Sequence, residues 1–210
     1  MSLVYDKINN QKIICVLEIV DLDSINPVCE ALIEGGVNII ELALRTSVSE
    51  RAAVLIKKNY PEITIGLGTV INTDQVKFAL DSGVEFAVSP GTNPKVIDFS
   101  LKSNLPFYPG VSSPSDIEIA VSHGCRLLKF FPAASLGGID FLKSMNDPYK
   151  YLNLKYIPLG GINHENVKDY LSSDIVLGVG GSWIASKKLI SSFKWDIIKK
   201  NAQEAKKLLI

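Results

Sequence analysis

Lys129 is the residue of this 210-residue chain whose surroundings most directly suggest covalent chemistry. It lies in the apolar run RLLKFFP, where Pro132 ends an expected strand. Lysine is seldom placed among Leu and Phe without a partner or a function. If Lys129 points inward, the loss of hydration and a nearby cation both favour the neutral amine. A neutral amine can add to a ketone and form a Schiff base. The alternative is a lysine whose ammonium group reaches solvent from an exposed strand edge.

The run ELALR supplies a second candidate pair. Side chains alternate along a strand, so Glu41, Ala43 and Arg45 share one face, and Leu42 and Leu44 take the other. The leucines suit contact with covering helices, which directs the other face into the interior. There a carboxylate can move protons, and a guanidinium can bind a carboxylate through two hydrogen bonds. The alternative is an acid and a base that only satisfy each other.

Glycine turns follow the last two expected strands, at Gly160-Gly161 and at Gly181-Ser182, where we expect a short helix to begin. In a (β/α)₈ barrel this is the usual phosphate site, because glycine lets backbone N–H groups come close to the phosphate oxygens. The alternative is an ordinary glycine turn. Thr69 follows the third expected strand and either donates to a substrate carboxylate or caps a helix.

The elements that would position these residues are eight short apolar runs separated by amphipathic segments. Ile, Val, Leu and Phe dominate most runs, as in strands buried on both faces. Helical periodicity predicts helices at residues 23–33, 72–80, 93–101 and 114–121. Strand ends recur about every 23 residues, the length that a strand, a helix and two short loops require. The runs are IICVLEIV, NIIELAL, ITIGLG, VEFAVS, LPFYPGV, RLLKFFP, LKYIPLGG and DIVLGVGG.

This alternation predicts an α/β fold, a (β/α)₈ TIM barrel in a single domain over residues 1–210. A short N-terminal arm and a final helix near residues 187–209 would complete it. An open doubly wound sheet is the alternative, disfavoured because no strand is followed by a G-x-G-x-x-G turn. Functional groups of such a barrel stand at the C-terminal ends of its strands, where the candidate residues lie.

Composition excludes several classes of protein. Lys+Arg and Asp+Glu number 22 each, so no positive excess is available for nucleic acid. Neither a signal peptide nor an apolar run long enough to span a membrane is visible, and we expect a soluble, cytoplasmic protein. Three scattered cysteines, Cys15, Cys29 and Cys125, indicate neither a disulfide framework nor a zinc site. No cluster of metal-ligand residues stands out, so we expect no metal.

Seven runs in order, IIELALRT, GLGTV, AVSPG, PGVSS, LLKFFPA, PLGGI and GVGGSW, resemble the KDPG/KHG aldolase family. These are class I aldolases that cleave 2-keto-3-deoxy-6-phosphogluconate or 4-hydroxy-2-oxoglutarate. The resemblance extends over about residues 13–184, and its most specific parts are E-x-x-x-R-T, K-F-F-P-A and G-G-S-W. It implies a trimeric (β/α)₈ barrel that acts on a small-molecule substrate without a metal or other cofactor.

The resemblance also implies a role for each matching residue. By motif position, Lys129 corresponds to the Schiff-base lysine and Glu41 to the general acid–base. Arg45 and Thr69 correspond to contacts with the pyruvyl carboxylate, and Pro90 to the wall of the pyruvate pocket. The phosphate-binding turns correspond to Gly160, Gly161, Gly181 and Ser182.

The chain departs from the common family pattern at several positions. Many relatives have arginine at Glu18, an acid at Ala134, threonine at Leu159 and Ser113, and alanine at Leu67. Glu18 would repel a phosphate if it faced the site, and Leu159 removes a hydroxyl donor near the phosphate turn. The sequence therefore supports the lyase chemistry better than it supports one substrate, phosphorylated or not.

Three hypotheses follow. The leading one is a Schiff-base aldolase that reversibly cleaves a 2-keto-3-deoxy acid to pyruvate and an aldehyde. The first rival is another phosphate-binding barrel enzyme, an isomerase or epimerase, which needs a second acid–base group facing Glu41 and usually a metal cluster. The second rival is a non-catalytic sugar-acid binding protein on the same scaffold, favoured by Glu18, Ala134 and Leu159.

Overall fold

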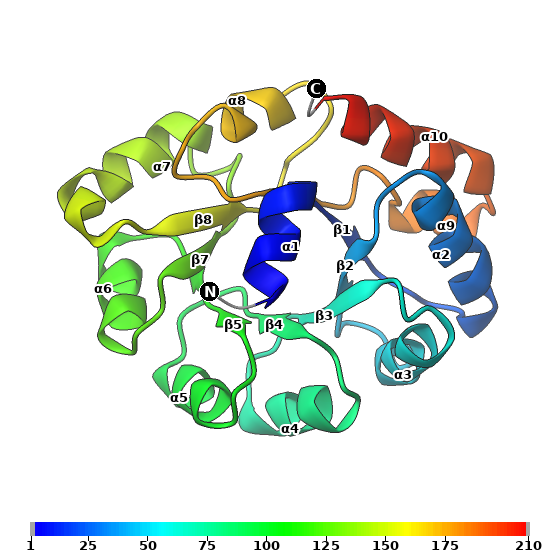
Figure 1. Cartoon of the computed structure of the whole chain (residues 1–210), viewed down its shortest axis with the longest axis horizontal. Coiled ribbons are helices and arrows are strands. Elements are labelled where there is room, and N and C mark those ends of the chain that lie inside the picture. Colours follow the sequence, from blue (N-terminus) through cyan, green and yellow to red (C-terminus); the bar gives the residue numbers. More distant parts are fainter. Residues whose placement is uncertain (1–2, 209–210) are drawn as a thin grey trace.

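The computed structural model describes residues 3–208 as an α/β fold with parallel strands at its centre and helices around them (Figure 1). Each of the eight apolar runs contains a strand, and the fifth run contains two short ones. Pro109 separates these two, because proline has no N–H to donate to a strand ladder. The strands are β1 (Ile13–Leu17), β2 (Ile39–Ala43), β3 (Thr64–Gly68), β4 (Phe86–Val88), β5 (Phe107–Tyr108), β6 (Gly110–Val111), β7 (Leu127–Phe130), β8 (Lys155–Pro158) and β9 (Val179–Gly181).

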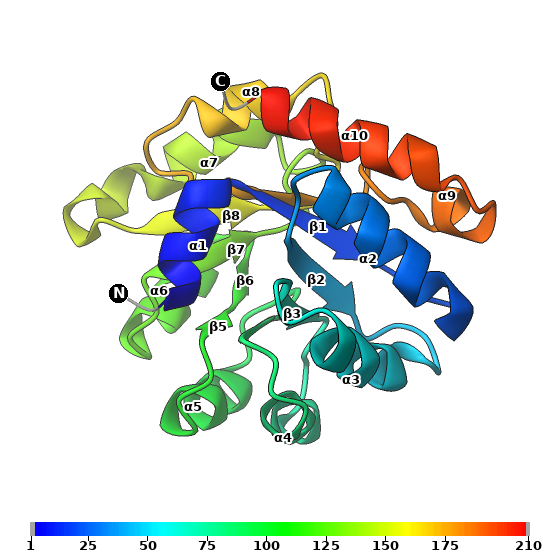
Figure 2. The same ribbon diagram turned by 45° about the vertical axis from the view of Figure 1, so that its right-hand side comes forward.

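The strands form two parallel sheets. A curled six-stranded sheet has the order β5-β4-β3-β2-β1-β9, and a three-stranded sheet has the order β6-β7-β8. Isolated bridges pair Tyr156 with Val176 and Leu159 with Gly180, next to the facing edges of the two sheets. Turned by 45°, the strands still surround a common centre (Figure 2). The predicted parallel α/β architecture is therefore present.

Helices other than the N-terminal one cover the outer face of the strands (Figure 1 and Figure 2). Those expected near residues 23–33, 72–80, 93–101 and 114–121 are confirmed to within one or two residues as α2, α4, α5 and α6. The helices are α1 (Leu3–Gln11), α2 (Ile25–Glu34), α3 (Ser49–Asn59), α4 (Thr73–Asp81), α5 (Pro94–Lys102), α6 (Pro114–Ser122), α7 (Gly138–Asn146), α8 (Val167–Leu171), α9 (Lys187–Ser191) and α10 (Trp195–Lys207), with short 3-10 segments η1 (Leu22–Ser24) and η2 (Asp147–Leu152).

The two ends of the chain differ in detail from the expectation, and one expectation is corrected. The N-terminal arm is helical, as α1, and the final helix is divided into α9 and α10. The division falls at Phe193, whose φ of 53° lies in the left-handed region and cannot continue an α-helix. Residues 1–2 and 209–210, including the expected end of the final helix, lie outside the described residues.

Local sequence explains where several helices begin. Asn72, Asn93 and Ser113 precede α4, α5 and α6, and each side chain accepts a hydrogen bond from a backbone N–H of the first turn. Pro94 and Pro114 then occupy the first helical positions, where the missing N–H of proline costs nothing. These caps fix the points at which the chain turns from each strand into its helix.

The apolar core has an outer and an inner layer. Alternation along β2 sends Ile40 to the outer layer beneath the helices and Ile39 to the inner layer. Val4 and Ile8 of α1 also belong to the inner layer, so α1 packs against the inner faces of the strands. Each fully buried aliphatic side chain contributes roughly 1.5–3 kcal/mol. The inner layer also carries the polar residues described next.

Candidate active site

Lys129 of β7 and Glu41 of β2 meet inside the strands. The Lys129 Nζ atom donates to Glu41 Oε1 at 2.8 Å. The two side chains are only 4% and 3% exposed, so Lys129 is not a surface lysine reaching for solvent. Both follow the strand alternation, because Leu127 and Ile39, two residues earlier, belong to the inner layer. The arrangement places an amine and a proton acceptor in contact, away from bulk water.

Gly68 makes room for this carboxylate. A Cβ atom at position 68 would lie 2.3 Å from Glu41 Oε1, closer than nonbonded atoms approach. Gly68 ends β3, which pairs with β2 in a register that places Gly68 beside Ala43. Sequence reasoning missed this role. The available signal was a glycine inside a buried strand, which often marks a close approach.

Phe131 provides an apolar wall beside the amine. Its ring centroid lies 5.5 Å from Lys129 Nζ, within the range of a cation–π contact. The residue directly follows β7 and lines the same cavity as Lys129. It was also missed as a site residue, although it belongs to the KFFP run.

Arg45 and Thr69 form a second polar contact. Arg45 Nε donates to Thr69 Oγ1 at 3.1 Å. Thr69 does not cap a helix, because Asn72 is the N-cap of α4. The backbone of Thr69 has a φ of 64° in the left-handed region, a conformation that costs energy and is often found at functional sites. The remaining guanidinium N–H groups of Arg45 do not contact Thr69, so they are available to an anion.

A cavity of about 270 Å³ joins most of the expected residues. Thr69 does not line it and reaches it only through Arg45. Pro90 is also outside the lining, and its carbonyl oxygen packs closely against Gly110. Sequence reasoning did not place Val16, Trp183 or Ser186 in this wall. Of the expected residues, the lining includes Glu41, Arg45, Lys129, Gly160, Gly161, Gly181 and Ser182.

The glycine turns require glycine for two different reasons. Gly160 and Gly161 have φ values of 90° and 81°, which side chains rarely adopt. Gly181 lies in β9, and a Cβ atom there would lie 2.2 Å from the Trp183 ring. The helix expected to begin near Ser182 begins instead at Lys187, so the wall at Ser182 is a bent loop. The turn itself still exposes backbone groups to the cavity.

Two departures from the family pattern are located at these turns. A Cβ atom at Gly161 would lie 2.5 Å from the Cβ of Ala134, so Ala134 packs directly against the turn. Leu159 lines the cavity and packs against Gly180. The surface at both positions is therefore apolar.

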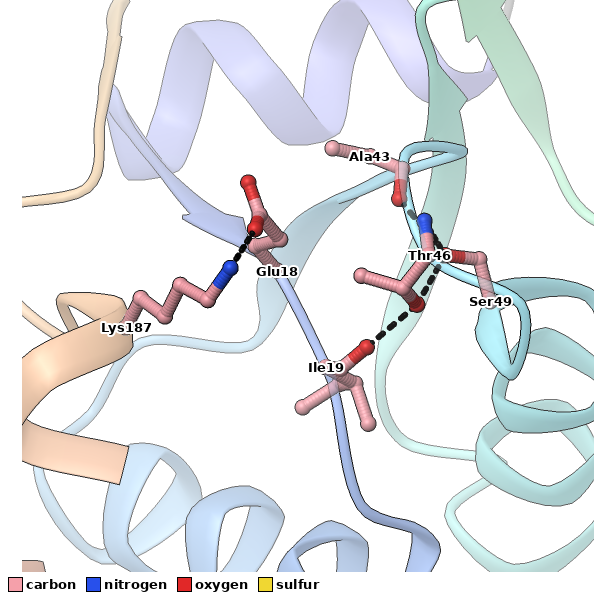
Figure 3. A network of polar contacts seen from close by, with 6 residues as sticks. All are labelled: Glu18, Ile19, Ala43, Thr46, Ser49 and Lys187. Carbon is pink, nitrogen blue, oxygen red and sulfur yellow. Dashed lines mark hydrogen bonds and ion pairs between the residues drawn. The ribbon is translucent and has the colours of Figure 1, made fainter. Parts of the chain in front are cut away.

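Glu18, the third departure, is paired with a cation. Its carboxylate accepts from Lys187 Nζ at 2.6 Å, and the two side chains point toward each other from the end of β1 and the start of α9 (Figure 3). Glu18 lies two residues after Val16, which lines the cavity. The alternation of the strand therefore directs Glu18 toward the same mouth.

A hydroxyl network fixes the loop that carries Arg45. Thr46 Oγ1 donates to the Ile19 carbonyl at 2.5 Å and contacts Ser49 Oγ at 2.8 Å. Ser49 Oγ donates to the Ala43 carbonyl at 3.0 Å. These bonds tie the end of β1 to the turn after β2 (Figure 3). Sequence reasoning did not single out either hydroxyl residue.

Other features of the described residues offer less chemistry. Within residues 3–208, no three or more His, Cys, Asp or Glu side chains gather as metal ligands, and no helix could cross a membrane. His123 pairs with Asp98 at 2.5 Å. Larger hollows of about 510 and 430 Å³ lie elsewhere, and neither is lined by Lys129 or Glu41. The 270 Å³ cavity is lined by an amine and an acid that are both buried and in contact.

Comparison with known proteins agrees with this geometry. The chain matches the family described as KDPG and KHG aldolase over residues 4–201. The chain belongs to the KDPG and KHG aldolase family. It is 37% identical over 201 residues to the 2-dehydro-3-deoxy-phosphogluconate aldolase of Haemophilus influenzae, covering 96% of this chain and 94% of that protein.

Two solved KDPG aldolase structures are also close. The Legionella pneumophila enzyme, which holds pyruvate as a covalent carbinolamine intermediate, superimposes with a TM-score of 0.91 at 35% identity, covering 96% of this chain and 97% of that one. The Zymomonas mobilis enzyme with 3-phosphoglycerate gives 0.86 at 33% identity, covering 96% and 94%. In the family to which this chain belongs, a pyruvate adduct and a phosphorylated acid have thus both been observed.

Proposed function

We propose that this chain is a class I aldolase that reversibly cleaves a 2-keto-3-deoxy sugar acid to pyruvate and an aldehyde. The observation that carries the proposal is the buried contact of 2.8 Å between Lys129 Nζ and Glu41 Oε1 at the wall of the cavity. Schiff-base chemistry needs a neutral amine and a group that takes and returns its protons. Glu41 is within hydrogen-bond reach for both tasks.

In the proposed reaction, Glu41 accepts a proton from the ammonium group of Lys129, and the free amine adds to the C2 ketone. Glu41 returns that proton to the hydroxyl of the resulting carbinolamine, which leaves as water and gives a cationic iminium, so Glu41 is a carboxylate again. Glu41 then removes the C4 hydroxyl proton, and the C3–C4 bond breaks. Its electron pair moves toward the iminium, which leaves an enamine on Lys129 and an aldehyde at the former C4. Protonation at C3 and addition of water release pyruvate and restore the amine.

Arg45, with Thr69 bound to it, would hold the substrate carboxylate, because a guanidinium matches a carboxylate through two parallel hydrogen bonds. This contact would fix C2 against Lys129. At the other side of the cavity, Gly160, Gly161, Gly181 and Ser182 would bind a distal phosphate, and Pro90 would support the wall of the pyruvate pocket. Binding energy from a distal group can assist bond cleavage remote from it.

The substrates we propose are 2-keto-3-deoxy-6-phosphogluconate, 4-hydroxy-2-oxoglutarate, or both. Support comes from the curated and structural relatives, which are named for these reactions. The titratable residues among the described lining are Glu41, Arg45 and Lys129. An isomerase or epimerase would need an acid–base group opposite Glu41, and the described lining supplies none besides Lys129, which the proposed reaction uses as its nucleophile. The aldolase reaction uses the groups that are present.

Borohydride trapping tests this function. With pyruvate present, borohydride should inactivate the enzyme and add a reduced pyruvyl group to Lys129, as located by mass spectrometry of a digest. Without pyruvate, the mass and activity should remain unchanged. Pyruvate release from the two substrates should be visible with coupled lactate dehydrogenase. Tight binding of the sugar acid with no pyruvate release and no adduct would instead indicate a non-catalytic binding protein.

The same proposal includes the assembly around the site. We infer that the two sheets form one closed (β/α)₈ barrel, supported by the bridge from Leu159 to Gly180 and by the single run that holds β5 and β6. Family resemblance supports a homotrimer, which light scattering on the purified protein would detect. Cys15, Cys29 and Cys125 are buried free thiols, which supports the proposal of a cytoplasmic protein, because cysteines stay reduced in that compartment.

A further inference from the structure

The pair formed by Glu18 and Lys187 adjoins the edge of the cavity formed by Val16 and Ser186, its mouth, and has no part in the reaction proposed above. Lys187 Nζ donates to Glu18 Oε1 at 2.6 Å, across 169 residues of sequence. Val16, two residues before Glu18 on the same face of the chain, lines the cavity. Ser186, directly before Lys187, lines it too. Both partners therefore adjoin the wall that contains the glycine turns.

The two partners differ in how freely they can move. The side chain of Glu18 is 27% exposed and projects from the end of a strand, whereas that of Lys187 is 56% exposed and ends in a flexible four-carbon stem. An exposed pair of this kind adds little to folding stability. The ammonium group can take on a second anionic partner without disturbing the core.

The negative charge of Glu18 affects how a phosphate can bind nearby. A bare carboxylate at Glu18 would repel a phosphate bound at the neighbouring turns of Gly161 and Gly181. Lys187 neutralises that carboxylate in the free protein. When a phosphate arrives, the ammonium group can hydrogen-bond to it while still facing Glu18. Lys187, at the start of α9, thus supplies the cation, and Glu18, directly after β1, holds it at the mouth.

We propose that Lys187 is a specificity-determining residue that binds the distal phosphate of the substrate, and that Glu18 is a positioning residue that holds its ammonium group at the mouth. This inference rests on the proposed aldolase function and adds a side chain to the phosphate end of the site. It predicts that the enzyme prefers a phosphorylated 2-keto-3-deoxy acid over its unphosphorylated counterpart, and that Lys187 carries part of that preference.

The test compares pyruvate release from 2-keto-3-deoxy-6-phosphogluconate and from 2-keto-3-deoxygluconate. In Lys187→Met, the ratio of the two kcat/KM values should fall roughly tenfold, the effect of losing one hydrogen bond to a charged group. The loss should appear mainly as a higher KM for the phosphorylated substrate. Lys187→Arg keeps the charge and should retain most of the preference. Lys188→Met is the matched control, because Lys188 is an exposed lysine of the same short helix.

Glu18→Gln alone tests the positioning role, because Lys187 then loses its partner. The ratio should fall below that of the wild type, and an unchanged or higher ratio would overturn the positioning role. The effect of the Glu18 charge on the phosphate itself is tested in the Lys187→Met background. There the carboxylate is uncompensated and repels the phosphate, so adding Glu18→Gln should restore part of the lost ratio. A double variant with the same ratio as Lys187→Met would show that Glu18 does not act on the phosphate. Equal ratios in Lys187→Met and Lys188→Met would overturn the role of Lys187.

Failure of this inference is distinguishable from failure of the proposed function. Borohydride trapping with pyruvate does not involve the distal phosphate. A wild-type protein that traps pyruvate while Lys187→Met keeps the full phosphate preference is an aldolase without this specificity residue. A wild-type protein that neither traps pyruvate nor releases it from either substrate is not an aldolase.

Discussion

Lys129 Nζ lies 2.8 Å from Glu41 Oε1, and this contact joins β7 to β2 inside the fold. Breaking a buried ion pair by removing one partner is costly, because the other charge stays in an apolar setting. The same burial excludes water from the amine that the proposed reaction uses. One contact thus affects both folding and catalysis, and these effects can be measured separately.

Replacing the nucleophile should abolish turnover. In Lys129→Met, pyruvate release should fall by a factor on the order of 10⁴ or more, the size seen when a covalent nucleophile is removed. Lys155→Met, at the start of the neighbouring β8, is the matched control and should keep nearly all activity. Coupled lactate dehydrogenase kinetics measure both. Turnover preserved in Lys129→Met would exclude the Schiff-base route.

A double variant should recover stability without recovering activity. Lys129→Met leaves the Glu41 carboxylate buried without its cation and should lower the free energy of unfolding by about 3–5 kcal/mol. Lys129→Met combined with Glu41→Gln removes both charges and should recover much of that loss while remaining inactive. Urea denaturation measures the two values. Equal stability in the single and double variants would show that the charges do not interact in the folded protein.

The contact of Gly68 with Glu41 can be tested with one methyl group. Gly68→Ala places a Cβ atom where the carboxylate lies, so the carboxylate must move away from Lys129. A displacement near 1 Å can cost about 10²-fold in rate, and we expect kcat/KM to fall by this order. Gly91→Ala is the control, because a Cβ atom there meets nothing within 4 Å. A Gly68→Ala enzyme as active as Gly91→Ala would contradict the proposed role of Glu41.

Site residues could be predicted from the sequence where the signal is local, and were missed where the role depends on contacts between residues far apart in the chain. Local signals, a cation in an apolar run and strand alternation, singled out Lys129 and Glu41 as candidates but left alternatives open, and their roles came from the family resemblance. Both lie on the inner face. Gly68 was missed because its role depends on the register between β2 and β3. The partner of Glu18 lies 169 residues away, a separation that no local pattern can bridge.

The ends of elements were predicted less well for a related reason. The break at Phe193 was missed because neither glycine nor proline marks it, and only the backbone conformation reveals it. The residues before the first strand were expected only as a short arm left over from the eight strand–helix units. The structure makes them helix α1, in which Val4, Ile8 and Gln11 are buried. Its helical state depends on packing against the strands, which local propensity does not record.

The loop network should control substrate binding through Arg45. Thr46→Val removes the hydrogen bonds to the Ile19 carbonyl and to Ser49 while keeping the size of the side chain. A loosened turn should raise KM several-fold with a smaller change in kcat, because Arg45 would hold the substrate carboxylate less well. Thr92→Val, which also removes a hydroxyl bond to a carbonyl, that of Gly110, is the control. Steady-state kinetics would contradict the prediction if both variants had the same KM.

Buried thiols should make the fold sensitive to alkali. Burial raises the pKa of Cys29 to about 12 and that of Cys125 to about 11, from an ordinary value of 9.0. Above pH 9 the unfolded chain loses thiol protons that the folded chain keeps, so the free energy of unfolding should fall as pH rises toward 11–12. Each thiol can contribute up to about 1.4 kcal/mol per pH unit in that window.

The Cys29→Ala and Cys125→Ala double variant checks the origin of this slope. Its stability at pH 8 should be lower, because two packed side chains are shortened, but its decline between pH 8 and 10 should be shallower than that of the wild type. Urea denaturation at each pH gives both quantities. At pH 8 the folded wild type should react only slowly with a thiol reagent, and urea should expose all three cysteines. Parallel stability curves for the two proteins would place the alkaline sensitivity elsewhere.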